Sequence, residues 1–494
     1  MRPLILAGLF AAACASGPSQ PGDGPLVVND LHSRLNATSV AERRTPTSVA
    51  EIQELVREAG RRGLAVSIAG GGHAMGGQQF GAGTMLIDMS RMDRVVAFDA
   101  ERGSIDVQAG IQWPALLDHL TTAQAGSRHP VGFRQKQTGA DRLSIGGALS
   151  ANVHGRGLAL PPFVSDVLHF TLVDADGDLV RCSRADNPEL FRLAIGGYGL
   201  FGVIAEVGLR LYPRTRLERV VAVAAVDELP ELFAQRLRDG HLYGDFQFST
   251  DSGSDDFLRR GVFATYRPAP ADAVVPETQQ ELSAADWREL YFLAHADKAA
   301  LYRRYVAFYQ STHGQLYWSD SHQMSVYLDD YHADVDRRLG VTTPGSEMIT
   351  EIYVPRAALP AFLAQVRQDF LAARTNLIYG TVRLIRRDTE SFLAWASADF
   401  ACIIFNLHVD HDARGIERAE REFRNLIDRG LEHGGCYYLT YHRWARKDQV
   451  VRAYPQFVEF LRRKLAHDPG ERFQSEWYRH YRAMFGPELA TAAR

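Results

Sequence analysis

The apolar and polar positions between residues 48 and 211 predict short strands and short helices. The capping box Ser48-x-x-Glu51 precedes an apolar stripe at helical spacing, so a helix should begin there. Further helices are expected at 113–123 and 187–193. Apolar runs predict strands at 64–68, 85–89, 95–98, 105–109, 169–173, 179–182 and 203–211. Asp176-Gly177 lies between two of these strands and predicts a hairpin.

The second half of the chain has a different pattern, with longer amphipathic segments. Helices are expected at 287–309, 357–373 and 415–432, and strands at 351–355 and 401–408. An exposed loop is expected at 268–280. Pro213 follows the last strand of the first half, and 494 residues are enough for two domains. We therefore predict domains at 40–213 and 214–494.

The N-terminus reads as a targeting segment. One arginine, Arg2, precedes a short apolar run at 4–13, which favours a signal peptide over residues 1–22. Cys14 follows three alanines and resembles a lipoprotein cleavage site, at which this cysteine would carry a lipid anchor. The alternative is a plain signal peptide cut near Ala13 or Ala15. Either one predicts an exported protein, periplasmic or anchored to a membrane. Because the targeting segment has no twin-arginine pair, a flavin would have to be loaded after export or by an unusual route.

Composition and charge exclude several function classes. The net charge is −4 and no basic block is present, which argues against a nucleic-acid partner. Cys182, Cys402 and Cys436 are far apart and lack metal-ligand spacing, so we expect core residues. Neither an H-E-x-x-H pattern nor a G-x-S-x-G elbow is present, so neither a metal site nor a serine hydrolase is predicted.

Two glycine-rich stretches carry the chemical signal. Residues 70–77 contain five glycines in eight positions, with His73 in the middle. Glycines allow the backbone to approach a ligand closely and to direct successive N–H groups at an anion such as a diphosphate. The spacing Gly197-x-Gly199-x-x-Gly202 matches a Rossmann fingerprint, but a helix precedes it and a strand follows. Because a Rossmann motif has the opposite order, we reject that interpretation.

Three motifs together resemble the vanillyl-alcohol-oxidase/p-cresol-methylhydroxylase (PCMH) superfamily of FAD enzymes. They are Ala65 to Gln78, Leu143 to Gly155, and Glu189 to Ile204, which occur in the family's order within residues 43–213. The similarity is greatest to the sugar-lactone and alditol oxidases, the decaprenylphosphoryl-ribose oxidases and the cytokinin dehydrogenases. The resemblance implies an α+β fold. A two-subdomain FAD-binding domain would precede a substrate (cap) domain with an antiparallel sheet flanked by helices. A fainter match at about 434–480 implies that this segment returns to the FAD domain.

The resemblance also assigns roles to residues of the FAD domain. Relatives with a histidine at the position of His73 join it covalently to the flavin, so a histidyl linkage is expected here. Ala74 stands where many relatives have serine, which should leave the linkage possible. The residues expected to bind FAD are Gly70, Gly71, Gly72, His73, Ala74, Gln78, Ser144, Gly146, Gly147, Ser150, His154 and Ile204. Outside the motif, Ser144 and Ser150 would be read as ordinary capping residues.

Four residues are predicted to carry the reaction: Arg383, His408, Tyr441 and His442. Alditol oxidases have a Glu-x-Arg pair where this chain has Thr381-Val-Arg383, so their polyol-binding mode is not expected to transfer intact. His442 lies near the family's active-site lysine and could act as the base. His408 could equally be a structural histidine.

The expected function is FAD-dependent oxidation of a CH–OH group on a small or sugar-like substrate, with oxygen or another carrier as electron acceptor. The alternatives are an oxidase of an amine or a glycan-linked alcohol, and a non-catalytic envelope lipoprotein that binds a ligand. The substrate and the oligomeric state do not follow from the sequence.

Overall fold

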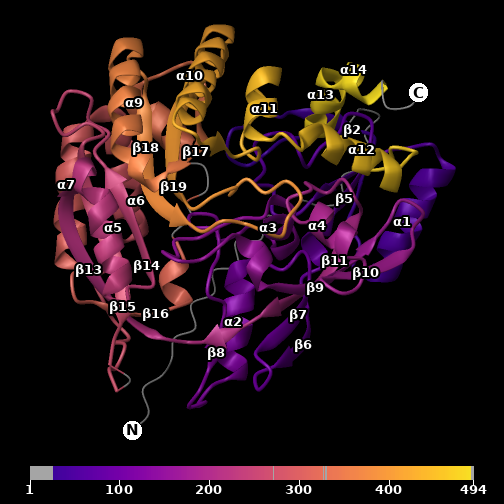
Figure 1. Cartoon of the computed structure of the whole chain (residues 1–494), viewed down its shortest axis with the longest axis horizontal. Coiled ribbons are helices and arrows are strands. Elements are labelled where there is room, and N and C mark those ends of the chain that lie inside the picture. Colours follow the sequence, from indigo (N-terminus) through magenta and orange to yellow (C-terminus); the bar gives the residue numbers. More distant parts are fainter. Residues whose placement is uncertain (1–25, 271, 326–327, 329–330, 491–494) are drawn as a thin grey trace.

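The structure, a computed structural model, describes residues 26–270, 272–325, 328 and 331–490 (Figure 1). The predicted signal peptide and Cys14 lie outside the described residues. Among the helices within the described ranges, none is both long and apolar enough to cross a membrane. The fold is α+β, with helices packed on mainly antiparallel sheets.

The N-terminal half opens with a small parallel sheet that supports the first glycine loop. Its strands β3 (Glu42–Arg44), β5 (Met85–Asp88) and β4 (Val66–Ala69) are ordered β3-β5-β4. Helix α1 (Val49–Arg61) begins at Ser48, whose side chain accepts a hydrogen bond from the Glu51 N–H, as the capping box predicts. A pair of short strands, β1 (Leu26–Val28) and β2 (Thr38–Val40), precedes this sheet.

A five-stranded antiparallel sheet completes this half. Its order is β10-β9-β11-β7-β6. The strands are β6 (Val95–Asp99), β7 (Ser104–Gln108), β9 (Val167–Val173), β10 (Leu179–Ser183) and β11 (Val203–Arg210). The helices are α2 (Trp113–Ala123), α3 (Ile145–Ala151) and α4 (Pro188–Ala194). Every strand and helix predicted in this half is confirmed, including the β9–β10 hairpin, in which Gly177 adopts a φ of +83°. Short strands β8 (Val131–Gly132) and β12 (Tyr212–Pro213) pair beside it.

An eight-stranded antiparallel sheet forms the core of the C-terminal half. Its order is β16-β13-β15-β14-β18-β19-β17-β20. The strands are β13 (Arg216–Ala225), β14 (Tyr243–Phe248), β15 (Arg260–Pro268), β16 (Leu316–Trp318), β17 (Gly345–Pro355), β18 (Leu377–Ile385), β19 (Phe400–Asp410) and β20 (Cys436–Tyr437). The predicted strands at 351–355 and 401–408 are therefore parts of two eleven-residue strands.

The two faces of this sheet have different partners. Phe405 of β19 packs against Phe362 and Phe370 of α9 (Leu359–Ala373). Helices α5 (Leu229–Arg238) and α10 (Ala413–Glu432) pack on the same face as α9. Because side chains alternate along a strand, Ile404 and Asn406 point to the opposite face. Both line a cavity there, together with residues of α6 (Ala284–Ala296) and α7 (Lys298–Ser311).

One predicted helix is wrong in its extent. The segment 287–309 is not continuous but forms α6 and α7, separated at Asp297. The Asp297 carboxylate accepts a hydrogen bond from the Ala300 N–H and so caps the second helix, an arrangement that interrupts the first. Helix α8 (Tyr331–Leu339) follows in sequence and contacts α6 and β17.

The C-terminal helices lie over the N-terminal half, as the yellow ribbon in Figure 1 shows. They are α11 (Lys447–Ala453), α12 (Phe457–His467), α13 (Glu476–Met484) and α14 (Gly486–Ala490). The Val66 N–H donates to the Arg472 carbonyl at 2.6 Å, and the Trp477 N–H donates to the Gly77 carbonyl at 3.1 Å. The closing segment is thus joined to the strand and loop that hold His73.

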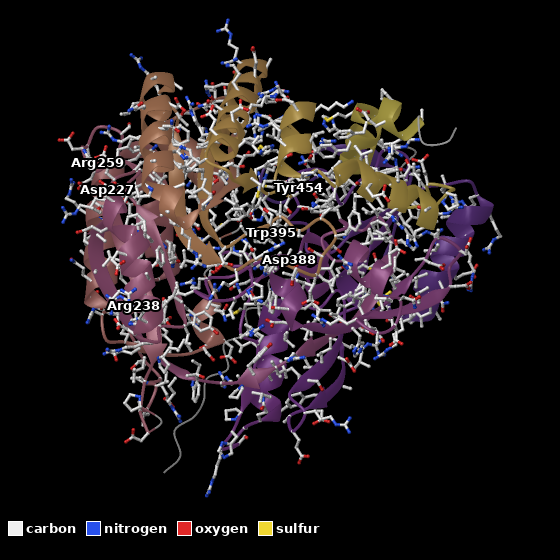
Figure 2. The ribbon with its side chains drawn as sticks, viewed as in Figure 1. Asp227, Arg238, Arg259, Asp388, Trp395 and Tyr454 are labelled. Atoms are coloured by element: carbon white, nitrogen blue, oxygen red, sulfur yellow. The ribbon has the colours of Figure 1, made fainter. Side chains whose placement is uncertain are left out.

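A buried polar contact joins the two halves at a second place. Asn152 ends α3 with a φ of +49°, and its side chain donates to Asp388 at 2.9 Å. The Trp395 indole N–H donates to the Asn152 carbonyl at 3.0 Å. In Figure 2, Asp388 and Trp395 lie near the centre of the view, whereas Arg238 and Arg259 lie near its left margin. Cys182, Cys402 and Cys436 are buried free thiols, which confirms their prediction as core residues.

Candidate active site

One cavity of about 940 Å³ lies between the glycine loops and the eight-stranded sheet. All residues predicted to bind FAD, except His154, line it. From the opposite side it is lined by Glu351, Arg383, Ile404, Asn406 and Tyr441. Two glycine-rich motifs, one face of the eight-stranded sheet and the segment around Tyr441, all distant in the chain, therefore meet at a single site.

The two glycine loops pack so closely that side chains would not fit between them. A Cβ atom on Gly70 would lie 2.1 Å from the Ser144 hydroxyl oxygen, and one on Gly71 would lie 2.2 Å from the Arg142 carbonyl. A Cβ on Gly146 would meet the Ala109 side chain at 2.8 Å. The backbone is thus exposed to the cavity without covering side chains, which fits the close approach of a diphosphate. The residues present therefore fit a dinucleotide cofactor.

Ser144 both caps a helix and faces the predicted FAD site, the two roles that the sequence left open. Its side chain accepts a hydrogen bond from the Gly147 N–H at 3.2 Å, so it caps α3, and it also lines the cavity. The second glycine stretch is accordingly helical over residues 145–151 rather than an open loop.

His73 is buried at the edge of the cavity beside a second histidine that the sequence did not single out. The Nε2 atom of His32 lies 2.6 Å from the Nδ1 atom of His73. Burial, and then the neighbouring His32, lower the pKa of His73 to about 3. The imidazole is therefore neutral at ordinary pH, so one of its two ring nitrogens carries a proton and the other a lone pair.

Gln78 fastens the first glycine loop to the closing segment. Its amide nitrogen donates to the carbonyls of Leu439, at 3.1 Å, and Thr440, at 2.8 Å. Its amide oxygen accepts from the Gly76 N–H at 3.0 Å. The side chain thus holds Gly76 and Thr440 together at the cavity wall, a role distinct from the ribose or diphosphate contact that the resemblance implies.

Arg383 is one of the arginines that line the cavity, together with Arg156 and Arg219. Only 4% of its surface is exposed, and within the described ranges its Nε and Nη1 atoms have no hydrogen-bond partner. Burying two guanidinium nitrogens without hydrogen-bond acceptors is costly unless a ligand supplies an acceptor. Thr381, in contrast, donates to the Phe246 carbonyl at 3.0 Å and does not line the cavity.

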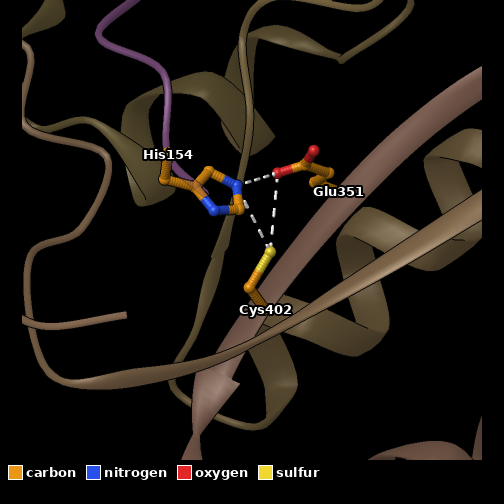
Figure 3. A group of neighbouring side chains, drawn as sticks. All are labelled: His154, Glu351 and Cys402. Carbon is orange, nitrogen blue, oxygen red and sulfur yellow. Dashed lines mark hydrogen bonds and ion pairs between the residues drawn. The ribbon is translucent and has the colours of Figure 1, made fainter. Parts of the chain in front are cut away.

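Glu351 is a buried cavity residue that the sequence analysis missed. Its carboxylate accepts hydrogen bonds from Tyr441 at 2.6 Å and Tyr353 at 2.8 Å, and its Oε2 lies 2.7 Å from His154 Nε2 (Figure 3). Burial alone would raise the pKa of Glu351, but His154, Tyr441 and the charge of Arg383 lower it to about 2. The site therefore contains a fixed, ionised carboxylate.

His154 and Cys402 lie behind this carboxylate (Figure 3). His154 is fully buried and does not line the cavity, so the structure places it against Glu351 rather than beside the glycine loops. Cys402 Sγ lies 3.5 Å from Glu351 Oε2, and burial raises the pKa of its thiol well above the usual value. Both residues are therefore placed to position Glu351.

Two of the four predicted catalytic residues are not at the cavity. His442 is buried among Phe423, Tyr437 and Trp444, and burial lowers its pKa to about 3. That position does not match the cavity-facing base expected from the sequence. His408 also does not line the cavity; its Nδ1 lies 3.3 Å from Glu347. Arg383 and Tyr441 do line it.

In the sequence, Glu351 could have been noticed only as an acidic residue within an apolar segment. The run Thr350-Glu-Ile-Tyr-Val-Pro355 reads as a strand, and an acid near its predicted start looked like a solvent-exposed end. The strand begins six residues earlier, at Gly345, so Glu351 lies in its middle. An acid in a buried strand requires buried partners, which is a sign of function.

Comparisons with known proteins agree with this site. The family model for the FAD binding domain matches residues 43–183. Mitochondrial L-galactono-1,4-lactone dehydrogenase of Arabidopsis thaliana is 30% identical over 40% of this chain and 32% of its own length. Bovine L-gulonolactone oxidase is 27% identical over 40% of this chain and 43% of its own length. Cytokinin dehydrogenase 2 of Arabidopsis thaliana is 32% identical over 34% of this chain and 32% of its own length.

The chain thus spans less than half the length of these relatives in each match. The region matched by the family model contains both glycine loops and falls within the domain predicted at 40–213. Residues 43–183 thus form an FAD-binding domain of the PCMH type, and in this part the chain is similar to the three relatives named above.

Proposed function

We propose that the protein is an FAD-dependent oxidoreductase that oxidises a CH–OH group of a small, sugar-like substrate. The observation that carries the proposal is the shared cavity, in which the glycine loops face Arg383, Glu351 and Tyr441. The lactone-oxidising relatives support a sugar-like substrate by analogy.

The residues that would hold FAD are those of the two glycine loops, with Ile204 and Tyr198 on the adjoining segment. When bound, FAD supplies the acceptor for a hydride from the substrate carbon. We propose that His73 carries the cofactor covalently, because its neutral imidazole lies at the cavity edge and is oriented by His32.

Arg383 would bind and orient the substrate. Its guanidinium can donate two hydrogen bonds to adjacent substrate oxygens, as a diol or a lactone presents them. Aromatic side chains of α7, Tyr302, Tyr305 and Tyr309, line the same cavity and offer faces on which a sugar ring can stack.

Tyr441 and Glu351 would accept the hydroxyl proton. The Tyr441 hydroxyl already donates to Glu351, so its oxygen can accept a hydrogen bond from the substrate. As the substrate proton moves to Tyr441, the tyrosine proton can move to the carboxylate, which leaves the charge balanced.

Two measurements test the proposal. Acid precipitation of the purified protein should leave yellow colour in the pellet of wild type but not of His73→Ala. Under anaerobic conditions, aldonolactones or polyols should bleach the flavin, and Tyr441→Phe should slow bleaching at least tenfold. Tyr212→Phe, which removes a hydroxyl bonded to Asp166 away from the cavity, serves as the control.

The same experiment separates the alternatives. Bleaching by cytokinin-like amines alone would favour an amine oxidase, and bleaching only by oligosaccharides would favour a glycan-linked substrate. A protein that binds FAD but is reduced by none of these compounds would match the non-catalytic lipoprotein. We also propose export through residues 1–22, with Cys14 as the lipid anchor and oxygen or another carrier as electron acceptor.

A further inference from the structure

A second buried carboxylate, Glu347, lies four residues before Glu351 on β17 and is surrounded by histidines. His295 of α6, His332 of α8 and His408 of β19 all point a ring nitrogen at it. Glu347 is 4% exposed. The proposed reaction uses none of these residues, so their convergence needs another explanation.

The two oxygens of Glu347 have different neighbours. Oε1 lies 3.2 Å from His295 Nε2 and 3.3 Å from His408 Nδ1. Oε2 lies 3.0 Å from His332 Nε2 and accepts a hydrogen bond from the Tyr331 hydroxyl. The ligand atoms of His295, Glu347 and His408 all lie within 4.8 Å of one another. Two imidazoles and one carboxylate oxygen therefore share a small volume.

The distances of the two histidine nitrogens from Oε1, 3.2 Å and 3.3 Å, are close to the ligand–ligand distances around a bound metal ion. Ligand atoms held at about 2.0–2.2 Å from a tetrahedral Zn²⁺ ion are about 3.3–3.6 Å apart. Hydrogen bonding among these side chains does not account for the position of His295 as well as a metal ion does. His295 Nε2 is buried and, in the part of the chain described, makes no hydrogen bond of acceptable geometry. That nitrogen is nevertheless 3.2 Å from Oε1. A metal ion placed between the three ligand atoms would give His295 Nε2 a bonding partner.

Neighbouring residues orient the side chains of the cluster in the way that residues around metal ligands do. His408 Nε2 lies 3.4 Å from Asp410 Oδ1, the carboxylate–histidine arrangement that fixes a ligand tautomer. A Cβ atom on Gly345 would lie 2.4 Å from the His408 ring, so glycine makes room for it. Burial opposes ionisation of Glu347, but contacts with His295, His332 and His408 keep its pKa well below the usual value. The carboxylate is thus available as an anionic ligand.

The cluster adjoins the main cavity. Glu347 and His332 line a smaller cavity of about 60 Å³. Its lining shares His32, Tyr331, Ile349 and Asn406 with that of the main cavity. An ion bound by three protein ligands keeps a position for water or another oxygen, and water could reach it through this smaller cavity.

We propose that His295, Glu347 and His408 bind one divalent transition-metal ion of the zinc class. His332 and Tyr331 hold the second oxygen of Glu347 and orient it. The sequence did not predict this site, because its three ligands are spread over more than 110 residues of the chain and no short motif contains two of them.

The buried trio His154, Glu351 and Cys402 does not support the same proposal. Glu351 Oε1 accepts from Tyr441, and Oε2 accepts from Tyr353 and lies 2.7 Å from His154, so both oxygens are already bonded. Burial also holds the Cys402 thiol in its protonated form, since it raises the thiol pKa.

The test uses FAD-loaded protein purified without a polyhistidine tag, treated with a chelator and dialysed. Titration with Zn²⁺, and with Co²⁺ followed at wavelengths beyond the flavin band, should give one ion per flavin. Glu347→Gln and His408→Ala should each weaken binding at least tenfold. His129→Asn, a change in an exposed loop, should bind as wild type does. Flavin content, measured in each variant, reports whether the fold is kept.

Wild-type protein that takes up no stoichiometric ion would overturn the proposal, as would equal binding by wild type and both variants. If the variants lose FAD, X-ray absorption at the zinc edge of the wild-type protein identifies the ligands of the bound ion instead. Two imidazoles and an oxygen ligand support the site, whereas water-only or thiolate ligation refutes it. Neither readout depends on turnover, so failure here is distinct from failure of the proposed oxidoreductase activity.

Discussion

The Nε2 atom of His32 lies 2.6 Å from the Nδ1 atom of His73, where His73 is buried and His32 is partly buried. Burial lowers the pKa of each histidine, so one neutral ring donates its N–H to the other. Since Nδ1 is engaged in this way, His32 fixes the orientation of the ring that would attack the flavin. His32 is therefore expected to position His73 for covalent bond formation.

Replacing His32 should reduce covalent attachment more than it reduces FAD binding. In His32→Ala the glycine loops are unchanged, but the His73 ring loses its 2.6 Å neighbour. We expect the acid-stable fraction of flavin to fall several-fold while total flavin per protein stays near the wild-type value. His129→Ala, an exposed histidine, provides the control. An unchanged acid-stable fraction in His32→Ala would refute the positioning role.

The close packing of the two glycine loops predicts a sharp difference between two glycine substitutions. In Gly71→Ala the new methyl group would lie 2.2 Å from the Arg142 carbonyl, so one loop must move. Overpacking of this kind costs about 1–3 kcal/mol and here distorts the cofactor site. We expect flavin content to fall at least fivefold. Gly470→Ala has open space around the new methyl and should retain FAD. Equal flavin contents in the two proteins would contradict this account.

Arg383 should contribute mainly to substrate binding. A charge-assisted hydrogen bond is worth about 1.5–3 kcal/mol, so Arg383→Ala should lower kcat/KM by about 10- to 150-fold. Most of the loss should appear in KM, and flavin content should not change, because Arg383 belongs to the cap sheet. Arg387→Ala removes an exposed arginine from the neighbouring loop and should have no such effect. Loss of FAD from Arg383→Ala would assign it a structural role instead.

The parts of the site that could be predicted are those formed by residues close together in the sequence. Each glycine loop is a continuous stretch whose composition reports its backbone geometry, and Gly70 to Gly72, Ser144, Gly146 and Gly147 all line the cavity. The strands of the N-terminal half were also predictable because their alternation is local. The break at Asp297 was missed because aspartate is tolerated in a helical pattern, and its capping hydrogen bond cannot be read from hydrophobicity.

The cap side was harder because its residues come together through strand pairing. Glu351 and Arg383 lie on strands that each pair with β19, near Cys402, although they are 32 positions apart in the sequence. His442 was chosen for its chemical type and its place in the resemblance, yet it is packed between Phe423 and Trp444. Which face of a chain segment meets the cavity is decided by tertiary packing, which the sequence pattern does not specify.

The Glu351 carboxylate should make the free energy of unfolding depend on pH in the acidic range. Its pKa is about 2 in the folded protein and about 4.5 in the unfolded chain. A carboxyl group with a depressed folded pKa stabilises the fold above its unfolded pKa, and this contribution disappears as the pH falls towards the folded value. The shift corresponds to about 3 kcal/mol, since the group is fully buried.

Glu351→Gln removes this titration while keeping the size and most hydrogen-bonding capacity of the side chain. Glutamine can accept from Tyr441 through its amide oxygen, but it cannot balance the charge of Arg383. The melting temperature of wild type minus that of Glu351→Gln should be constant above about pH 5.5 and should shrink between pH 4.5 and pH 2. Glu54→Gln, a change in an exposed residue paired with Arg61, corrects for general acid effects. A difference that stays the same from pH 6 to pH 3 would mean that Glu351 is not the ionised group at the cavity wall.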